Sequence, residues 1–359
     1  MGSRDRRLAS GFVYNYFRIG KALQDVRMIE RLTIANFLCS TETHPLLSYC
    51  LEKFSLINGE VMKSSLQEKI SEIRNHYEQF NPEKIFPFAE HLSDRINKKK
   101  FIESFLQQPG LWIRIRNGFR EKVLDEFVEK KILFEVDDHH PLSLSLVNST
   151  SLEKTDAFLK GYFEIQDWSS QQMIRYIQPK PNETWWDACA GSGGKSLMMM
   201  DAEPTVTILA SDSRASMLKN MEERFNKAGT KNHKTIHLDL SKPISDSQLP
   251  FTGFDTILAD VPCSGSGTWA RTPEWLLMFD EKSLIHYVTL QRNIIKNLSG
   301  SLEKDKRLVF ITCSVFTEEN EKNVAWIPAN TALTLLDTAY MEGWAKGADS
   351  MFVATFIKQ

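Results

Sequence analysis

Five short apolar runs in the second half of the chain are each followed by a side chain that can ionise. Helical stretches separate these runs, and strands that alternate with helices are typical of a parallel α/β sheet. In an open parallel sheet, ligands bind in a crevice outside the carboxyl ends of the strands. We therefore expect the side chains at these ends to converge on one crevice. They are Asp187 after 184–186, Asp212 after 206–211, Asp239 after 234–238, Asp260 after 256–259 and Cys313 after 307–312.

The spacing of apolar residues divides the chain into three predicted parts. Up to residue 108, apolar residues recur at three- and four-residue spacing, as in 31–38 and 66–80, which predicts a helical region. The breaker Pro109-Gly110 follows, and residues 109–158 mix strand and helix patterns, which predicts a small α+β subdomain. Residues 159–359 carry the α/β pattern and are expected to form a Rossmann-like domain.

The composition of the 359 residues narrows the class of protein further. A net charge of −2 gives no global basic field, so a polyanion would have to bind to local patches. The 5 cysteines are scattered, with no C-x-x-C pair, which argues against a disulfide framework or a zinc site and for a reducing compartment. The sequence shows no signal-peptide pattern and no apolar run near ~18 residues. We expect a cytoplasmic, monomeric protein with no metal site and no membrane partner.

A glycine-rich turn follows the first of the apolar runs and opens a helix. Glycines let the backbone approach a ligand closely, and a helix N-terminus offers free N–H groups. The spacing is wrong for a phosphate loop, which would need glycine at Cys189, and for a dinucleotide turn, which would need glycine at Ser196. With Asp212 suited to a ribose diol, the turn favours a nucleoside-bearing cofactor, and S-adenosylmethionine before NAD. The candidate contacts are Cys189, Ala190, Gly191, Ser192, Gly193, Gly194 and Lys195.

Cys263 and Cys313 both lie at or just beyond the end of a predicted strand, so both thiols could face the crevice. Two thiols beside a methyl-donor site suggest methylation at carbon 5 of a pyrimidine, a poor nucleophile until a thiolate adds at carbon 6. A thiol of pKa ~8.5 is only slightly ionised at neutral pH, so its surroundings must favour the thiolate. Asp260 is available as an acid near N3, and the second cysteine could assist release of the product.

Simpler interpretations of these residues stay open. The glycine turn could serve packing alone, and Cys189, in a loop of small residues, could be a buried spacer. Cys263 and Cys313 could be structural thiols. A DNA cytosine methyltransferase, in which a Pro-Cys thiol attacks, would make Cys263 the nucleophile and would not need Cys313.

Four segments within residues 159–359 carry motifs that together resemble the RsmB/Nop/NSUN family of RNA 5-methylcytosine methyltransferases, of the bacterial ribosomal-RNA type. The last two motifs together are highly specific, and the last argues against the DNA enzyme. The segments are 161–171, similar to G-x-x-x-x-Q-D-x-S-S/A-Q; 187–195, similar to D-x-C-A-A-P-G-G-K; 260–267, similar to D-A-P-C-S-G-T-G; and 312–321, similar to T-C-S-x-x-x-E-E-N-E.

The resemblance implies a class I S-adenosylmethionine-dependent methyltransferase domain, preceded by the small α+β subdomain and the helical region. It implies that Cys313 attacks carbon 6 of a cytosine in RNA, that Cys263 assists release and that Asp260 lies near the base. Ribosomal RNA is the expected substrate, with transfer RNA as the alternative. The donor is expected to contact Cys189 to Lys195, Asp212, Asp239 and Asp260.

The middle segment resembles the family's small RNA-binding subdomain. Its candidate contacts offer charge and stacking surface to an RNA strand. They are Trp112, Arg114, Arg116 and Arg120. Arg114 and Arg116 could equally be the solvated face of an ordinary strand. Because Gly191-Ser192 replaces the family's Ala-Pro, a non-catalytic RNA-binding assembly factor also stays open.

Overall fold

A computed structural model shows that the chain forms two compact units. The structure describes residues 2–42, 44–54 and 62–359. The helical unit consists of residues 1–109 and 268–280, and the sheet unit of residues 110–267 and 281–359. Part of the helical unit is therefore an insertion in the chain of the sheet unit, and all of the predicted strand ends lie in the sheet unit.

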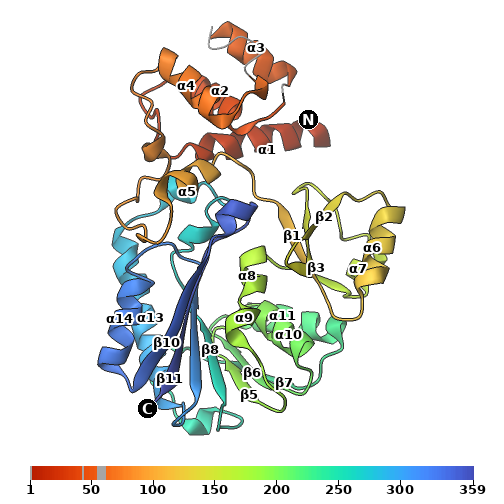
Figure 1. Ribbon diagram of the computed structural model, residues 1–359, viewed down its shortest axis with the longest axis vertical. Helices are drawn as coiled ribbons and strands as arrows, with labels where there is room; N and C mark the ends of the chain where they lie inside the picture. The colour runs from red at the N-terminus through yellow and green to blue at the C-terminus, as the bar shows by residue number, and fades with distance from the viewer. Residues whose placement is uncertain (1, 43, 55–61) are drawn as a thin grey trace. The chain divides into compact units, whose positions relative to one another are not determined.

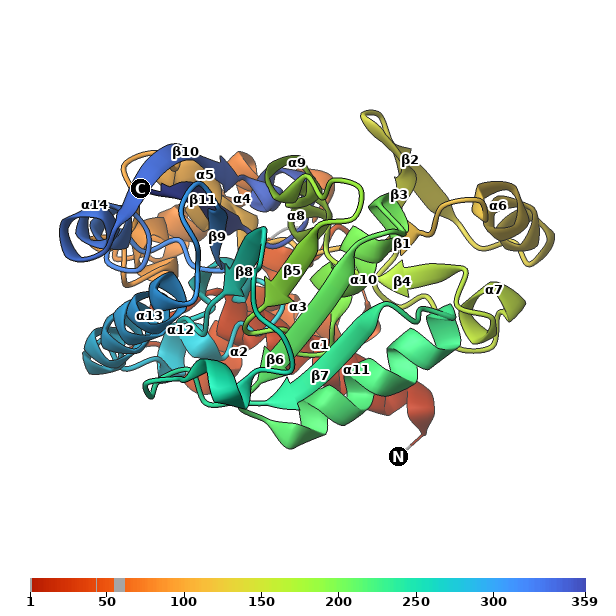
Figure 2. The ribbon, with the colours of Figure 1, turned by 90° about the horizontal axis from the view of Figure 1, so that it is seen from below.

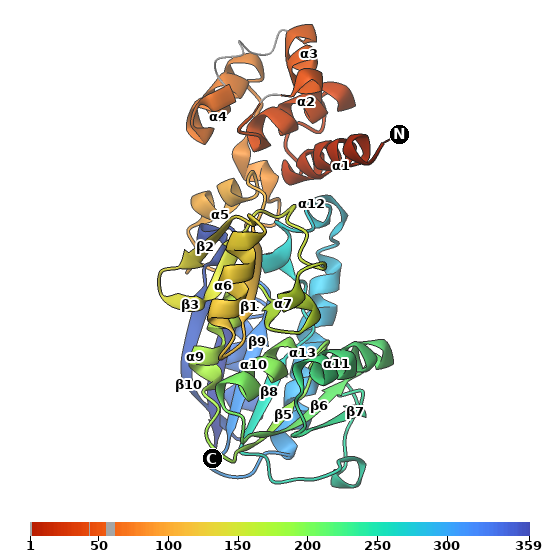
Figure 3. The same ribbon diagram turned by 90° about the vertical axis from the view of Figure 1, so that its right-hand side faces the viewer.

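The helical unit is built from short helices. They are α1 (Ser3–Arg18), α2 (Met28–Cys39), α3 (Pro45–Lys53), α4 (Leu66–His76), the 3-10 turn η2 (Pro82–Ile85), α5 (Lys98–Ser104) and α12 (Trp275–Met278). Figure 3 shows α1 to α4, in red to orange, grouped around α2, which packs against the other three. The helices predicted at 31–38 and 66–80 correspond to α2 and α4. A capping box starts α4, in which the Ser65 N–H donates to the Glu68 carboxylate at 2.7 Å.

The insertion at 268–280 is part of the core of the helical unit. Trp269 is fully buried, and its ring centroid lies 5.5 Å from that of Phe88. Arg18, also buried, donates a hydrogen bond to the carbonyl oxygen of Ala270 at 2.9 Å. The segment is therefore fixed by packing and by a charge-assisted hydrogen bond to the N-terminal helices.

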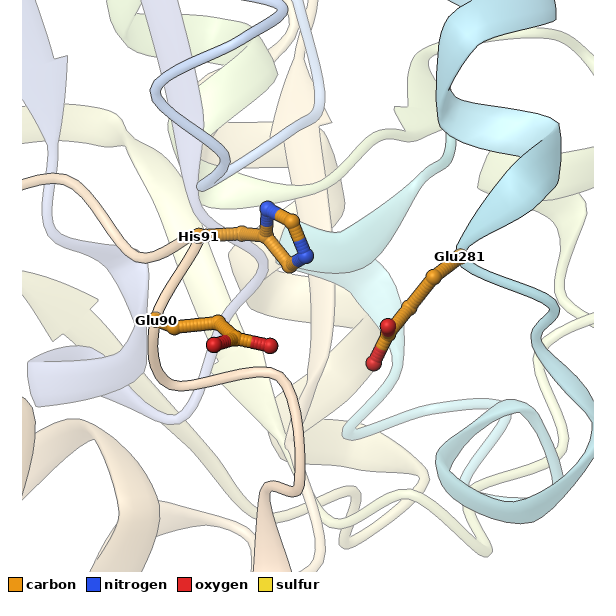
Figure 4. A group of neighbouring side chains, drawn as sticks. All are labelled: Glu90, His91 and Glu281. Atoms are coloured by element: carbon orange, nitrogen blue, oxygen red, sulfur yellow. The ribbon is translucent and has the colours of Figure 1, made fainter.

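The chain re-enters the sheet unit at Glu281, the N-cap residue of α13 (Lys282–Gly300). Figure 4 labels Glu281 and also Glu90 and His91, which are consecutive residues of the helical unit between η2 and α5. These three side chains come from both units, and the site described below includes none of them.

An antiparallel sheet of 4 strands, in the order β2-β3-β1-β4, begins the sheet unit. Its elements are β1 (Leu111–Ile115), α6 (Arg120–Glu129), β2 (Phe134–Asp137), β3 (His140–Leu146), α7 (Asp156–Leu159) and β4 (Phe163–Ile165). Ile113 and Ile115 pack with Phe127 of α6 in one apolar cluster. Arg114, on the other face of β1, is also buried. The face of β1 that carries Arg114 is therefore not the solvated face that the sequence left open, because an ion pair described below covers it.

A 7-stranded sheet forms the rest of this unit, in the order β10-β11-β9-β8-β5-β6-β7. Its parallel strands are β5 (Thr184–Asp187), β6 (Thr207–Asp212), β7 (His233–His237), β8 (Thr256–Asp260) and β9 (Arg307–Thr312). The antiparallel strand β11 (Met351–Lys358) lies between β9 and β10 (Leu333–Met341). The predicted Rossmann-like α/β fold is confirmed.

Helices connect these strands. They are α8 (Trp168–Gln172), α9 (Ile174–Ile177), α10 (Gly194–Ala202), α11 (Ala215–Ala228), α13, α14 (Glu321–Asn330) and the 3-10 turns η3 (Asp246–Gln248) and η5 (Gly343–Lys346). Figure 2 shows α13 and α14 on one side of the large sheet and α10 and α11 on the other. Across the described part of the chain, every helix is too short or too polar to cross a lipid bilayer.

Both faces of the large sheet are packed at its centre. Trp185 and Trp186 are consecutive residues of β5 and both are 0% exposed. Because successive strand residues point to opposite faces, Trp186 joins the cluster that includes Ile295 of α13, and Trp185 joins the cluster with Phe225 of α11. This double cover leaves the carboxyl ends of the strands as the place for polar side chains.

The strand order reverses next to β5 (Figure 1). The chain passes from β5 to β6 and β7 on one side, then returns to place β8 on the other side of β5. Connections that leave a parallel sheet in opposite directions open a crevice between the strand ends, which is where ligands bind in such sheets. Asp187, Asp212 and Asp260 are the last residues of β5, β6 and β8, and Cys313 directly follows β9.

Candidate active site

A cavity of about 500 Å³ lies at the carboxyl ends of β5, β6 and β8. This size is typical of a pocket for a small organic ligand. Five of the predicted site residues line it, and three of them, Asp212, Asp239 and Asp260, are among the five side chains predicted to converge from the strand ends. The other two, Asp187 and Cys313, are not in its lining. The lining residues are Ala188, Cys189, Asp212, Ser213, Arg214, Leu238, Asp239, Leu240, Ser241, Asp260, Pro262, Cys263, Leu290 and Ile294.

The glycine-rich turn between β5 and α10 is shaped by Gly193. This residue has φ 78° and is the N-cap of α10. A Cβ atom added there would lie 2.6 Å from Cγ of Met221 and 2.8 Å from Cε1 of Phe225. Only glycine therefore lets the turn pack this closely on α11 while keeping a left-handed conformation. The other predicted contacts of this turn, Ala190, Gly191, Ser192, Gly194 and Lys195, are in the turn or at the start of α10 and are not in the lining of the cavity.

Both carboxylate oxygens of Asp212, at the end of β6, accept hydrogen bonds. Its Oδ2 accepts a hydrogen bond from the Gly191 N–H at 2.9 Å, which ties the turn to β6. Its Oδ1 accepts from the Arg214 N–H at 2.8 Å and from Arg214 Nε at 3.0 Å. Burial alone would raise the pKa of Asp212, but the hydrogen bonds from Arg214 outweigh it and hold the pKa below its ordinary value. A ribose hydroxyl would meet a carboxylate that is ionised and fixed.

Arg214 was not predicted, although it lines the cavity. It stands two residues after a predicted acid, Asp212, and an arginine at that distance can turn back onto the strand end.

Asp239 is more open than Asp212, with 43% of its side chain exposed, and it accepts a hydrogen bond from Ser241 Oγ at 2.6 Å. That hydrogen bond, the main cause, lowers the pKa of Asp239. The sequence placed Asp239 correctly because it follows the last strand of the β5-β6-β7 half.

Lys195 and Asp260 form an ion pair in the crevice. Lys195 Nζ lies 2.6 Å from Asp260 Oδ2, and the two side chains are 10% and 29% exposed. Burial would lower the pKa of Lys195, but the adjacent Asp260 carboxylate outweighs it and raises that pKa. The pair therefore places an ammonium group at the end of β8, next to the segment that carries Cys263.

Asp187, at the end of β5, is a deeply buried carboxyl group. It is 1% exposed, and its Oδ2 accepts a hydrogen bond from Ser196 Oγ at 2.6 Å. Its Oδ1 has no hydrogen-bond partner among the described residues. Burial raises the pKa of Asp187 to about 7. A buried, unpaired acceptor of this kind is suited to a donor group on a ligand.

Cys263 and Cys313 come together at the edge of the cavity, with Sγ atoms 3.3 Å apart. Cys263 lies four residues before Gly267, whose N–H donates to the Cys313 carbonyl oxygen at 2.9 Å. A Cβ at Gly267 would lie 2.1 Å from the Ser350 carbonyl oxygen and 2.9 Å from that of Cys313. The two loops therefore meet through close backbone contact that a larger residue would prevent.

The two thiols have different electrostatic surroundings. The hydrogen bond with Cys313 and burial are the largest causes that raise the pKa of Cys263, and the Glu319 carboxylate adds to them. The charge of Lys195, by contrast, interacts with Cys313. Because a nearby anion disfavours a thiolate, these surroundings favour a proton on Cys263.

Glu319 and Gln291 were not singled out from the sequence, although both are 0% exposed beneath the cysteines. Gln291 Nε2 donates to Glu319 Oε1 at 2.9 Å and to the Pro262 carbonyl oxygen at 3.0 Å. Glu319 lies in the segment that resembles T-C-S-x-x-x-E-E-N-E, which was the available signal. The sequence did not indicate which of its two adjacent glutamates turns inward.

The predicted RNA contacts of the middle segment are largely occupied within the protein. Trp112 is 5% exposed. Arg114 Nη1 lies 2.6 Å and Arg116 Nε 2.9 Å from the two carboxylate oxygens of Asp201, at the end of α10. Arg120 is exposed and donates to the Pro141 carbonyl oxygen at 3.1 Å. These residues are not brought together with the cavity, and their part in RNA binding stays a prediction.

Comparison with known proteins connects this site to a family. Residues 174–354 match the protein family described as 16S rRNA methyltransferase RsmB/F. The chain is 29% identical over 245 residues to the ribosomal RNA small subunit methyltransferase B of Shewanella oneidensis, a match that covers 67% of this chain and 56% of that protein. The chain thus spans about half the length of the first curated relatives that it matches.

Two solved structures have a similar fold. The crystal structure of PH0851 has a TM-score of 0.75 at 20% identity and covers 99% of this chain and 91% of its own. The structure of NSun6 from Pyrococcus horikoshii with SFG, an analogue of S-adenosylmethionine, has a TM-score of 0.66 at 19% identity. It covers 76% of this chain and 97% of its own. At these identities the likeness establishes the fold.

Proposed function

Since this chain belongs to the family described as 16S rRNA methyltransferase RsmB/F, we propose that it methylates carbon 5 of a cytosine in ribosomal RNA. The expected cofactor is S-adenosylmethionine, which supplies an electrophilic methyl group when bound. One observation carries the proposal about chemistry: two thiols 3.3 Å apart beside a lysine–carboxylate pair, at the rim of a cavity of about 500 Å³. A structural role for the cysteines would not need this combination.

The residues present fit the proposed cofactor. The nucleoside hydroxyls are suited to Asp212, which is ionised and fixed by Gly191 and Arg214. The amino group of the methionine moiety is suited to the unpaired Oδ1 of the buried Asp187. Apolar side chains that line the cavity, such as Leu238 and Ile294, would cover the flat base.

In the proposed reaction, the Cys313 thiolate adds to carbon 6 of the cytosine and makes carbon 5 nucleophilic. Lys195 stabilises that thiolate, because its ammonium charge acts on Cys313. Asp260 is held next to the site by Lys195 and would interact with the base edge near N3. Cys263, which carries a proton, is placed against Cys313 and assists its departure after methyl transfer and loss of the C5 proton.

Ribosomal RNA is proposed as the substrate because the matched family and the Shewanella relative are both named for it. Arg120, exposed on the small subdomain, is the predicted contact best placed to meet a phosphate. Arg114 and Arg116 both pair with Asp201, so their contribution to RNA binding would be indirect, through stabilising the shape of the subdomain. Transfer RNA is the alternative substrate. We also propose a monomer that works in the cytoplasm, consistent with 5 free cysteines.

Covalent trapping tests the proposal. The full chain, Cys263→Ala and Cys313→Ala are incubated with S-adenosylmethionine and end-labelled 16S rRNA or transfer RNA, then separated on denaturing gels. We expect a labelled protein–RNA band that accumulates with Cys263→Ala and is absent with Cys313→Ala. Cys50→Ala, a buried thiol of the helical unit, is the matched control and should behave like the full chain.

The other outcomes discriminate among the alternatives. The reverse pattern, with adduct in Cys313→Ala, would assign the attack to Cys263 and contradict the mechanism. Adduct with transfer RNA and none with 16S rRNA would replace the proposed substrate. Retained RNA binding without S-adenosylmethionine binding or methyl transfer would support an assembly factor instead.

A further inference from the structure

Glu319 is a buried carboxylate with an unusual number of hydrogen-bond donors around it. It is 0% exposed. Its Oε1 accepts from the Ser264 N–H at 2.8 Å and from Gln291 Nε2 at 2.9 Å. Its Oε2 accepts from the hydroxyls of Ser264 and Ser314, each at 2.5 Å. Charge-assisted hydrogen bonds of this kind are stronger than neutral ones, and they offset part of the cost of burying the charge.

The donors come from the two loops that carry the thiols. Ser264 follows Cys263 directly, and Ser314 follows Cys313 directly. One carboxylate therefore joins the loop after β8 to the loop after β9. Gln291 adds a third connection, because the amide that binds Glu319 also donates to the carbonyl oxygen of Pro262, on the other side of Cys263. The shared acceptor therefore connects the residues that directly follow both thiols.

The charge of Glu319 also acts on the thiols. Cys313 and Glu319 both contribute to raising the pKa of Cys263, after its hydrogen bond with Cys313 and its burial. Tyr287 faces the same group, and its pKa is raised by burial, by Cys263 and by Glu319. Lys195 acts on the other thiol. Burial raises the pKa of Glu319 itself, whereas the hydrogen bonds from both serines favour its carboxylate.

We infer that Glu319 is a positioning residue that holds the two cysteine loops in register and keeps the proton on Cys263. The inference rests on the proposed two-cysteine reaction and extends it. Glu319 is not one of the residues that line the cavity, so it acts through Ser264 and Ser314 rather than on the substrate. Its charge and its hydrogen-bond geometry are separate contributions, and two substitutions separate them.

Glu319→Gln removes the charge with almost no change of shape, and its amide can still accept from the Ser264 N–H. Glu319→Ala removes both the charge and the acceptor that four donor groups share. Glu318→Gln is the matched control, because the neighbouring Glu318 pairs with Lys322 at 2.8 Å. Thermal melts establish that each variant is folded.

Two readouts are used. In single-turnover methylation, we expect Glu319→Ala to lower the rate of adduct formation roughly tenfold to a hundredfold, with KM for RNA nearly unchanged. In alkylation by iodoacetamide without RNA, resolved by peptide mass, we expect Cys263 of Glu319→Gln to react faster at pH 8 than Cys263 of the unmodified chain, because the anion that disfavours its thiolate is gone.

These results are distinguishable from failure of the proposed function. If the unmodified chain transfers no methyl group and Cys263→Ala forms no adduct, the proposed function fails, and the alkylation measurement still decides the role of Glu319. Unchanged alkylation of Cys263 in Glu319→Gln overturns the inference, as does a Glu319→Ala variant that is folded and forms adduct at the normal rate. An equal loss in Glu318→Gln would also overturn it.

Discussion

Lys195 Nζ lies 2.6 Å from Oδ2 of Asp260, and this ion pair joins the start of α10 to the end of β8. The pair spans the point where the strand order reverses, so it links the glycine-rich turn between β5 and α10 to the loop that carries Cys263. In the proposed reaction, this pair fixes Asp260 near the base edge. The ammonium group of Lys195 also interacts electrostatically with Cys313. Lys195 therefore interacts both with Asp260 at the end of β8 and with Cys313 after β9.

A double-mutant cycle of Lys195→Met and Asp260→Asn should reveal this coupling. We expect an interaction energy of about 1–3 kcal/mol in urea unfolding, because the lysine is largely desolvated and each single change leaves a charge without its partner. Lys306 and Asp255 form the matched control at the same distance of 2.6 Å, with side chains 35% and 30% exposed. That pair should give about 0.2–1 kcal/mol. Equal coupling in both pairs would contradict the role of burial.

Gly193→Ala should destabilise the sheet unit through steric conflict. The new Cβ would meet Met221 at 2.6 Å and Phe225 at 2.8 Å, on a backbone with φ 78°. We expect a loss of about 2–4 kcal/mol in the free energy of unfolding. Gly229→Ala is the control, since Gly229 has φ 72° and nothing within 4 Å of the added atom. It should lose only about 1 kcal/mol, and a similar loss at both sites would show that the contacts at Gly193 do not matter.

The sequence was sufficient for the features that are local in the chain. Apolar runs closed by Asp187, Asp212 and Asp260 became β5, β6 and β8 with these residues at their ends. Both faces of a parallel sheet are buried, so its strands are apolar and the first polar side chain marks where a strand ends. An apolar run followed by an acid is therefore a pattern that the sequence shows directly. The glycine turn and the two cysteines were found for the same reason, since each belongs to a short motif.

The features that were missed depend on partners far apart in the chain. Arg114 and Asp201 are 87 residues apart, so alternation in β1 could not indicate that an ion pair covers its polar face. The insertion at 268–280 joins the helical unit through Trp269, which only tertiary packing decides. Glu319 was recognised as part of a motif, but its inward direction depends on Ser264, 55 residues earlier.

Oxidation should inactivate the enzyme reversibly, because the sulfur atoms of Cys263 and Cys313 are 3.3 Å apart. A peroxide oxidises one thiol to a sulfenic acid, and the other thiol displaces water to form the disulfide. We expect loss of methyl transfer, a linked pair of peptides in non-reducing mass spectrometry, and recovery with dithiothreitol. Cys263→Ser should form no linked pair under the same treatment. Inactivation that dithiothreitol fails to reverse would point to a different lesion.

Asp187 should make the stability of the protein fall with rising pH. Burial raises its pKa from 3.8 to about 7 in the folded chain, so between these values the unfolded chain releases a proton that the folded chain keeps. The free energy of unfolding therefore decreases as pH rises from about 4 to about 7 and levels off above it. Asp187→Asn removes this titration. In urea unfolding without cofactor, its stability relative to the unmodified chain should improve by roughly 2–4 kcal/mol from pH 4 to pH 8.

Asp255→Asn is the control of opposite sign for this experiment. Burial would raise the pKa of Asp255, but the hydrogen bond from Lys306 outweighs it and holds the pKa below its ordinary value. Asp255 therefore contributes stability above its unfolded pKa, and that contribution is lost as pH falls through its folded pKa. Asp255→Asn should be less stable than the unmodified chain at pH 8, with a smaller deficit at pH 4. If both variants changed in the same direction with pH, the assignment of a raised pKa to Asp187 would be wrong.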